Sequence, residues 1–331
     1  MISTERPPVS VVMPVRNEVE GLVTAVESVL QQDYEGDLDL WVAVAPSIDG
    51  TEGLLDELAA EHPQVHRVDN PSGDTPAGLN AAIAASAGEV IVRVDGHARL
   101  PQGYIRTAVA TLLRTGAVNV GGRQHAVGRT PFERAVAAVT NSWIGSGGAR
   151  YRTGGTAGPV DTVYLGVFRR EAGDAVGWFD EGLLRNQDYE LNVRLRGAGG
   201  VVWFDPDLVV EYRPRSSYGA LARQYFEYGQ HKYYVSKLHP KSIRARQAAP
   251  ALVVPGLTAA ICSCLFIPQL ALMPLAYLTF VTTMTYRLRP WNWQLVIVSL
   301  TIHLSWSFGF WWNATRELCS IRMFRKNGGS V

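Results

Sequence analysis

Short runs of β-branched and apolar residues alternate with amphipathic segments through the first two thirds of the chain. Continuous apolar runs predict buried strands, whereas apolar residues at helical spacing predict helices. Strands are expected at residues 9–15, 38–44, 65–68, 90–94, 118–120, 163–168 and 201–204, with helices after residues 18 and 51 and over 76–87, 104–113 and 191–196. Strands that alternate with helices are typical of an α/β fold with a doubly wound, mostly parallel sheet.

The pattern changes near residue 246. Residues 248–286 contain no Asp, Glu, Lys or Arg, and Pro268 divides them into two segments of roughly the length that crosses a bilayer. Residues 290–315 form a third uncharged stretch, with tryptophans near both ends as expected at membrane interfaces. We therefore predict an α/β domain at 1–246 and a membrane-associated helical region at 247–331, with a hairpin over about 248–286 and a third apolar segment over about 290–315.

Basic residues predict how this region is oriented. Arg287 and Arg289 follow the hairpin directly, and basic residues favour the cytoplasmic side of a membrane. If residues 290–315 then crossed fully, the basic C-terminus would face outward. We therefore expect the third segment to be re-entrant or interfacial.

Composition and charge exclude several classes of protein. The chain has 31 basic and 30 acidic residues, so it lacks the positive field that nucleic acid binding requires. Its three cysteines show neither a disulfide framework nor a zinc pattern. The first eight residues are polar and contain no apolar core of a signal peptide, so the α/β domain is expected on the cytoplasmic face of the inner membrane.

The strand predicted at 90–94 ends on Asp95-Gly96-His97. In open α/β sheets, ligands bind in the crevice beyond the carboxyl ends of the strands. A carboxylate and an imidazole at that point suit Mn²⁺ or a similar divalent ion that holds a diphosphate. The alternative is a turn that ends the strand and carries an incidental histidine.

Residues 221–232 are aromatic and basic, and they include Arg223, Gln224 and Lys232. One interpretation is an amphipathic helix whose aromatic face packs against the rest of the protein. The other is a basic clamp at a place where phosphate and lipid meet. The sequence leaves both open.

Five motifs then establish a family resemblance. The segments 14–18 (Pro-Val-Arg-Asn-Glu), 77–80 (Ala-Gly-Leu-Asn), 88–89 (Gly-Glu), 95–97 (Asp-Gly-His) and 186–188 (Asn-Gln-Asp) resemble, in order and spacing, the signatures of family 2 glycosyltransferases. The resemblance covers roughly residues 7–235. Residues 92–97, 185–190 and 223–229 are similar to the succinoglycan-type branch of the family, which builds exopolysaccharide.

This resemblance implies a GT-A fold, a nucleotide-sugar donor such as a UDP-sugar, a divalent cation (Mn²⁺ or Mg²⁺), inversion at the anomeric carbon and a lipid-linked acceptor. It also implies roles for individual residues. Asp188 is the expected catalytic base, and Asp95 and His97 the expected cation ligands. The expected nucleotide-sugar residues are Pro14, Arg16, Asn17, Glu18, Asp49, Asn80 and Asp95, and those expected near the acceptor or diphosphate are Gln187, Arg223, Gln224 and Lys232.

The chain departs from the family pattern at three places. Asp95-Gly96-His97 stands where the family usually has Asp-x-Asp, and Val44 and Ala45 stand where acids usually read the uracil. The Gln-x-x-Arg-Trp motif of processive synthases is absent in its strict form, which favours addition of a single sugar. The resulting hypothesis is a membrane-associated inverting glycosyltransferase. Alternatives are a polyprenyl-phosphate sugar synthase and a non-catalytic membrane scaffold with a degraded site.

Overall fold

The computed structural model describes residues 6–327, with side chains up to residue 317. The chain forms two compact units. Unit 1 comprises Met1–His125 and Gly154–Tyr212, and unit 2 comprises Ala126–Thr153 and Arg213–Val331. These units do not follow the expected boundary at residue 246, because α10 (Tyr218–Leu238) packs along the C-terminal helix α14 (Trp293–Asn327).

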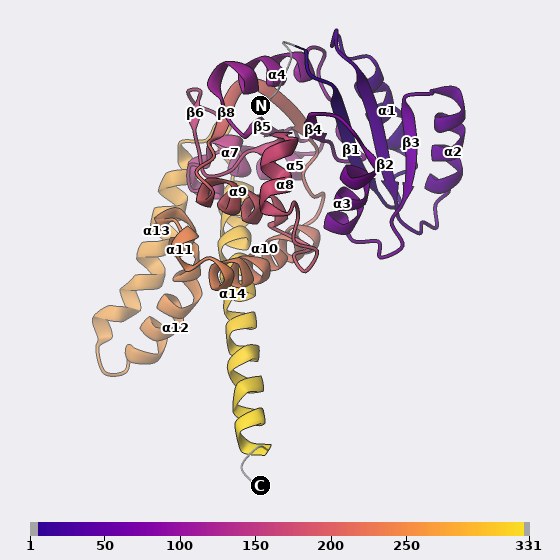
Figure 1. Ribbon diagram of the computed structural model, residues 1–331. Coiled ribbons are helices and arrows are strands. Elements are labelled where there is room, and N and C mark those ends of the chain that lie inside the picture. The colour runs from indigo at the N-terminus through magenta and orange to yellow at the C-terminus, as the bar shows by residue number, and fades with distance from the viewer. Residues whose placement is uncertain (1–5, 328–331) are drawn as a thin grey trace. The chain divides into compact units, whose positions relative to one another are not determined.

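Unit 1 is built on an eight-stranded sheet with the strand order β3-β2-β1-β4-β7-β5-β8-β6 (Figure 1). β1 pairs in parallel with β2 and β4, and β2 in parallel with β3. β7 is antiparallel to both β4 and β5. The predicted mostly parallel, doubly wound arrangement is confirmed for the first four strands. The strand bounds are β1 Val9–Val15, β2 Leu38–Val44, β3 Val65–Asp69, β4 Val90–Arg93, β5 Asn119–Ala126, β6 Gly158–Pro159, β7 Tyr164–Arg169 and β8 Val202–Tyr212.

Helices cover both faces of this sheet. One apolar cluster joins the strands to α1, α2 and α4, and a second joins them to α3 and α9. The strand order reverses between β1 and β4, so the loops that follow these two strands open a crevice at the carboxyl edge. The helices of unit 1 are α1 Leu22–Leu30, α2 Thr51–Glu61, α3 Thr75–Ala85, α4 Tyr104–Thr115, α8 Arg170–Val176 and α9 Gln187–Gly197.

Unit 2 is helical and is organised around α14. Gly229 of α10 and Gly309 of α14 let the two backbones approach closely: a Cβ at Gly229 would lie 2.0 Å from the carbonyl oxygen of Trp306, and one at Gly309 would lie 2.0 Å from that of Phe226. The first half of α14 packs against α5, α6 and α10. The remaining elements are α5 Pro131–Thr140, α6 Trp143–Ser146, α7 Arg150–Thr153, η1 Pro240–Ser242, α11 Ala245–Ala251, α12 Val253–Ser263, η2 Pro268–Ala271 and α13 Leu272–Tyr286.

The predicted hairpin is present, but its helices are shorter than expected. α12 has 11 residues and α13 has 15. At 1.5 Å per residue they are about 16 and 22 Å long, less than the roughly 30 Å of a bilayer core. The chain leaves the helical conformation at residues 264–267, and η2 then leads directly into α13. That the two segments cross a membrane stays a prediction.

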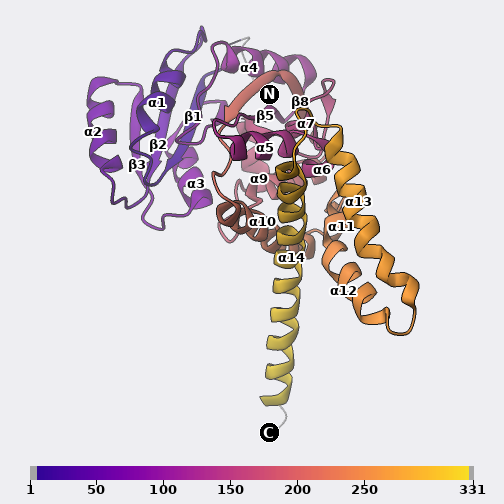
Figure 2. The ribbon, with the colours of Figure 1, turned by 180° about the vertical axis from the view of Figure 1, so that it is seen from behind.

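The third apolar segment lies within α14, which is one continuous helix and does not turn back on itself (Figure 2). Within the described part of the chain, its stretch Trp293–Glu317 is the one helix long and apolar enough to cross a membrane, with 25 residues and a mean hydropathy of 1.4.

Candidate active site

A buried arginine lies between two carboxylates at the carboxyl edge of the sheet. Arg93 ends β4, and its side chain is 9% exposed. Its Nη2 lies 2.9 Å from Oδ1 of Asp95, and its Nη1 forms an ion pair with Oδ1 of Asp188 in the first turn of α9. The fold thus brings together Asp95 and Asp188, which are 93 residues apart in the sequence and were both predicted to act in the site.

Arg93 also controls the charge of Asp95. Burial alone would raise the pKa of the Asp95 carboxyl, but the charges of Arg93 and His97 and hydrogen bonds from Arg93 and Tyr164 outweigh it and lower the pKa. The hydroxyl of Tyr164 donates to Oδ2 of Asp95 at 3.3 Å. Burial likewise works against the charge of Arg93, yet Asp188 and Asp95 raise its pKa. Asp95 is therefore a carboxylate at neutral pH.

The carboxylate of Asp188 remains accessible, with 35% of its side chain exposed. The cap position of α9 is held by Asn186, which lies two residues before Asp188, has φ 61° and makes no side-chain cap hydrogen bond. Asp188 is therefore not the cap of the helix, and its carboxylate pairs with Arg93. Glu190 is buried and pairs with Arg194 at 2.7 Å, so it is not available as a base.

Two polar side chains hold the loop that leads to Asp188. Arg194 donates from Nη1 to the carbonyl of Val176 at 2.6 Å and from Nη2 to that of Trp178. Asn80 of α3 donates to the carbonyl of Phe179 at 2.8 Å and accepts from the amide of Phe179 at 3.1 Å. Asn80 was predicted to bind the donor. Here its amide anchors the loop, and the donor contact stays a prediction.

The loops after β1 and β2 are joined by Asp49. Its carboxylate accepts hydrogen bonds from the hydroxyl of Thr51 at 2.6 Å, the amide of Thr51 at 3.0 Å and the amide of Val19 at 3.1 Å. These bonds, led by that from the Thr51 hydroxyl, lower the pKa of Asp49. The predicted nucleotide-binding residue Glu18 is held in the same way, since its amide donates to the Thr51 hydroxyl at 2.8 Å.

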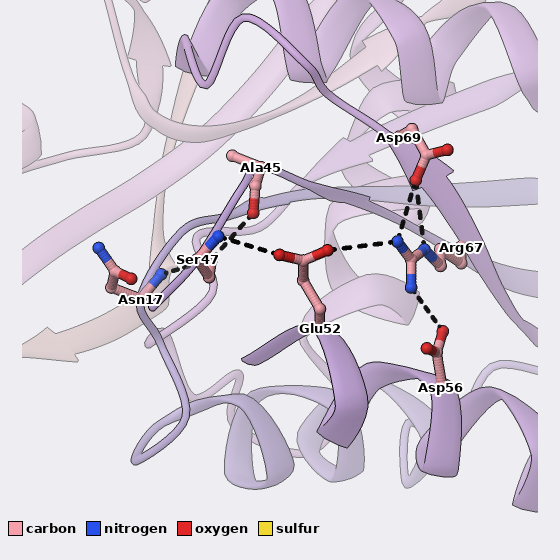
Figure 3. A network of polar contacts seen from close by, with 7 residues as sticks. All are labelled: Asn17, Ala45, Ser47, Glu52, Asp56, Arg67 and Asp69. Atoms are coloured by element: carbon pink, nitrogen blue, oxygen red, sulfur yellow. Dashed lines mark hydrogen bonds and ion pairs between the residues drawn. The ribbon is translucent and has the colours of Figure 1, made fainter. Parts of the chain in front are cut away.

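A second network holds the predicted nucleotide residue Asn17 (Figure 3). The amide of Asn17 donates to Oγ of Ser47 at 3.1 Å, and its own Oδ1 accepts from the amide of Ile48 at 2.9 Å. The amide of Ser47 donates to Glu52, which lies 3.5 Å from Arg67. Arg67 also pairs with two further carboxylates, those of Asp56 at 2.7 Å and Asp69 at 3.1 Å.

Left-handed backbone conformations cluster around these loops. Asn17 has φ 53°, and Leu165, which follows Tyr164, has φ 45°. Together with Trp178 and Asn186, they make four non-glycine residues with positive φ in the described part of the chain, and all four belong to unit 1. Such strain is concentrated at functional sites, where the surrounding structure over-determines the backbone.

The donor set for a cation consists of one carboxylate with a histidine nearby. No three His, Cys, Asp or Glu side chains converge on a metal position in the part of the chain that the structure describes. Nδ1 of His97 lies 2.9 Å from Oε1 of Glu18. Because Mg²⁺ and similar ions commonly use one or two carboxylates together with substrate phosphates and water, Asp95 fits an ion shared with a diphosphate. The role of His97 as a ligand stays a prediction.

The other predicted residues have varied surroundings. Pro14 lies in β1, and the exposed Arg16 has its guanidinium beside Gly73. Gln187 is buried in the first turn of α9. Arg223, Gln224 and Lys232 lie on α10 of unit 2, and their contact with a diphosphate or acceptor stays a prediction.

Arg93 and Tyr164 were not identified from the sequence. Arg93 did carry a signal, because it is the one charged residue in the apolar run 90–94, and a buried charge requires a partner. Tyr164 carried none, since an aromatic residue at the start of a strand is ordinary.

Comparisons with known proteins agree with this geometry. Residues 10–177 match the family described as "Glycosyl transferase family 2". The chain is 30% identical over 318 residues to the succinoglycan biosynthesis protein ExoA of Rhizobium meliloti (strain 1021), which covers 94% of this chain and 95% of that protein. It is 23% identical to the dolichyl N-acetyl-alpha-D-glucosaminyl phosphate 3-beta-D-2,3-diacetamido-2,3-dideoxy-beta-D-glucuronosyltransferase of Methanococcus voltae, over 68% of this chain and 72% of that one.

A solved structure shares the fold. The mannosyltransferase PcManGT from Pyrobaculum calidifontis, in complex with GDP-Man and Mn²⁺, has a TM-score of 0.65 at 19% identity and covers 93% of this chain and 87% of that chain. This likeness confirms the predicted fold class.

Proposed function

We propose, from the premise that this chain belongs to glycosyl transferase family 2, that it moves one sugar from a nucleoside diphosphate donor to a lipid-linked acceptor at a membrane. The chain is a glycosyltransferase of polysaccharide or glycolipid synthesis, so the alternative of a non-catalytic scaffold is set aside. Donor, acceptor and membrane attachment are the proposed part.

One observation carries the proposal: Arg93 is held between Asp95 and Asp188. Asp95 lies at the β1/β4 switch point, where α/β sheets bind their ligands. Asp188 faces the same arginine from the start of α9 and is accessible. The two carboxylates therefore have different surroundings, as a donor-side group and an acceptor-side base require.

The reaction we propose is a single displacement. Asp188 accepts the proton of an acceptor hydroxyl as its oxygen bonds to the anomeric carbon, and the bond from that carbon to the diphosphate oxygen breaks. The electron pair leaves with the nucleoside diphosphate, and the configuration at the anomeric carbon inverts. A positioned base of this kind contributes on the order of 10²–10⁴-fold to the rate. Arg93 orients both carboxylates and keeps its charge throughout.

The donor would lie against the loops that Asp49 and the Ser47–Glu52–Arg67 network hold rigid. Asp95, with His97 nearby, would hold Mn²⁺ or Mg²⁺ together with the diphosphate, and the ion would stabilise the charge of the leaving group. PcManGT, described with GDP-Man and Mn²⁺, supports a sugar nucleotide and a divalent ion. A UDP-sugar remains our proposed donor.

Two observations support a lipid-linked acceptor at a membrane. The Methanococcus voltae relative is named for a dolichyl phosphate-linked acceptor. Unit 2 contains the uncharged stretch 248–286 and the apolar helix Trp293–Glu317. We propose that unit 2 attaches the enzyme to the cytoplasmic face of the inner membrane, and that Gln187, Arg223, Gln224 and Lys232 act near the acceptor or diphosphate.

The test is a panel of nucleotides carrying labelled sugars, incubated with the full-length enzyme, Mn²⁺ or Mg²⁺ and membrane lipid extract. We expect one donor to label an organic-extractable product that contains a single added sugar. Absence of both hydrolysis and transfer with every donor would overturn the proposal. If the acceptor were instead a bare lipid phosphate, no proton would need removal at neutral pH, and Asp188→Asn would retain transfer.

A further inference from the structure

The α12–α13 hairpin presents large apolar side chains on its outside. Its tip, between the two helices, consists of Leu265, Phe266 and Ile267, and the first two side chains are each 86% exposed. Leu252 and Ile261 before the tip and Leu272 and Leu275 after it are also exposed. A contiguous apolar surface of this kind marks a site of interaction with a membrane or another protein.

The length of the hairpin is suited to one leaflet. Its helices reach about 16 and 22 Å, and a whole hydrocarbon core needs roughly 30 Å. Backbone that is not helical lies within a membrane only where its polar groups are satisfied. At the non-helical residues 264–267, the amides of Phe266 and Ile267 donate to the carbonyl of Ser263 at 3.0 and 2.9 Å. The carbonyl of Ile267 accepts from the amide of Leu270 in the short helix η2 at 3.0 Å.

The charged residues on either side of the hairpin are basic, which favours an anionic membrane as its partner. Residues 228–316 contain no Asp or Glu, but they contain eight basic residues. Arg244, Arg287 and Arg289 are exposed and lie just outside the two ends of the uncharged run. A surface that is basic at its rim and apolar at its tip complements anionic lipid headgroups above hydrocarbon.

Aromatic rings gather where the hairpin ends. At the end of α13, Tyr286 packs against Trp291 with ring centroids 5.8 Å apart, and Trp291 packs against Trp293 at 5.2 Å. The guanidinium of Arg289 lies 4.7 Å from the centre of the Tyr286 ring. Tyrosine, tryptophan and arginine side chains of this kind are enriched where a protein meets the membrane surface.

The inner side of the hairpin is fixed to α14 by hydrogen bonds. Nδ1 of His303 bonds the hydroxyl of Tyr277 at 2.8 Å, and its Nε2 lies 2.8 Å from the carbonyl of Ile144. Trp311 donates to the carbonyl of Ala251 at 2.7 Å. These bonds direct Tyr277 toward α14, whereas the exposed side of the hairpin carries the large apolar side chains together with the uncharged polar residues Thr258, Gln269, Thr279 and Thr283.

We propose that α12–α13 is a re-entrant hairpin that enters one leaflet of an anionic membrane and returns to the same side. The proposal rests on the membrane attachment of the proposed function and specifies its mode. The hydrocarbon chains of membrane lipids would cover the exposed apolar side chains of the hairpin. Lipid chains would also fill the cavity of about 520 Å³ along α13, lined by Leu272, Leu275, Ala276, Thr279, Phe280, Thr283 and Met284.

The chain carries its own probes for this topology. Cys262 and Cys264 lie just before the tip, and Cys319 is the third cysteine of the sequence. In a full-length Cys319→Ser protein, sealed membrane vesicles of both orientations are treated with a membrane-impermeant maleimide, with and without detergent. A Glu57→Cys variant on the exposed surface of α2, made without Cys262 and Cys264, reports the side that unit 1 faces.

We expect Cys262 and Cys264 to react only after detergent is added. Reaction from the side opposite to Glu57→Cys would show that the hairpin crosses the bilayer. Reaction from the same side without detergent would show that it remains in water. Either result overturns the proposal, and neither bears on sugar transfer.

A second experiment uses flotation with vesicles that contain anionic lipid. Phe266→Asp places a charge at the tip, and we expect its partition into vesicles to fall at least about tenfold. The matched control is Ile48→Asp in unit 1, where the isoleucine is 97% exposed, and it should partition as the wild type does. Equal partition of all three proteins would contradict the proposal. Transfer by Phe266→Asp to a detergent-solubilised acceptor should persist, which separates failure of insertion from failure of the proposed activity.

Discussion

The carboxyl edge of the sheet in unit 1 and residues 228–316 of unit 2 use charge in opposite ways. In unit 1, charged side chains gather at the carboxyl edge of the sheet and are paired there, as Arg93 is with Asp95 and Asp188, and Arg67 with Glu52, Asp56 and Asp69. In unit 2, residues 228–316 have no acidic side chain, and residues 248–286 have no charged one. Pairing keeps charge in place for chemistry, whereas its absence lets a surface meet hydrocarbon.

We infer that catalysis and membrane attachment depend on different residues. The proposed base Asp188, the cation carboxylate Asp95 and their shared Arg93 lie in unit 1, and the proposed membrane hairpin lies in unit 2. Lesions should therefore separate the two properties. A site substitution should stop transfer without release from the membrane, and a hairpin substitution should do the reverse.

The largest effect is expected from loss of the cation or of its carboxylate. Removal of divalent ions with EDTA should abolish transfer and addition of Mn²⁺ or Mg²⁺ should restore it, because the leaving diphosphate then lacks its counter-charge. Asp95→Ala should abolish transfer even with the ion present. Membrane flotation should be unchanged in both cases. Full activity after thorough removal of metal would refute this prediction.

Substitution of Arg93 should have the next largest effect. Arg93→Gln leaves Asp95 and Asp188 without the group that orients them, so we expect kcat to fall by at least about tenfold. Breaking this buried pair should also lower the free energy of unfolding by several kcal/mol. Arg93→Lys keeps the positive charge but loses the guanidinium whose two nitrogens contact Asp95 and Asp188. Its kcat should therefore lie between those of Arg93→Gln and the wild type. The donor KM should change less than kcat.

The matched control for these variants is Arg106→Gln. Arg106 also pairs with a carboxylate, Asp33 at 2.9 Å, but it is exposed on α4. The Arg106→Gln enzyme should transfer sugar at the wild-type rate. Melting temperatures measured in parallel identify a variant that fails to fold. A kcat for Arg93→Gln equal to that of the control would remove Arg93 from the site.

A smaller, pH-dependent effect is expected in unit 2. The hydrogen bond from Arg213 and those from the amides of Thr130 and Arg129 lower the pKa of Glu133 from 4.5 to about 2. A lowered pKa stabilises the folded state above pH 4.5, and this stabilisation is lost as the pH falls from 4.5 to about 2. The difference in unfolding midpoint between wild type and Glu133→Gln should therefore shrink over that range. A difference that stays constant would argue against the pairing.

The sequence predicted the parts of the fold that depend on local pattern. The strand at 90–94 and its acidic end were found because a β-branched run ends on Asp95. Part of α9 was found at 191–196, where leucine and valine alternate with arginine before a run of glycines. The meeting of the Asp95 and Asp188 carboxylates does not follow from the rule that parallel strands end at one edge, because Asp188 opens a helix and β7, the strand before it, runs antiparallel to β4. The family signatures supplied the same residues independently.

What the sequence could not predict depends on partners chosen by the tertiary structure. Asn80 and Asp49 are polar residues in signature segments, and only the fold reveals that they bond to Phe179 and to Thr51 and Val19. The apolar character of α14 indicated a membrane segment, yet its first half packs on α5, α6 and α10. Periodicity alone does not distinguish a core helix from one that faces lipid.

The most direct test of the central claim is sugar transfer by Asp188→Asn in the full-length enzyme. The substitution keeps the size of the side chain and removes its ability to take a proton. We predict a folded protein with a lowered melting temperature, because Arg93 loses one of its two carboxylates, together with retained binding of the sugar nucleotide and transfer reduced at least about a hundredfold. Asp180→Asn, on the loop before α9, should transfer near the wild-type rate. Transfer by Asp188→Asn at that rate would contradict the assignment of Asp188 as the base.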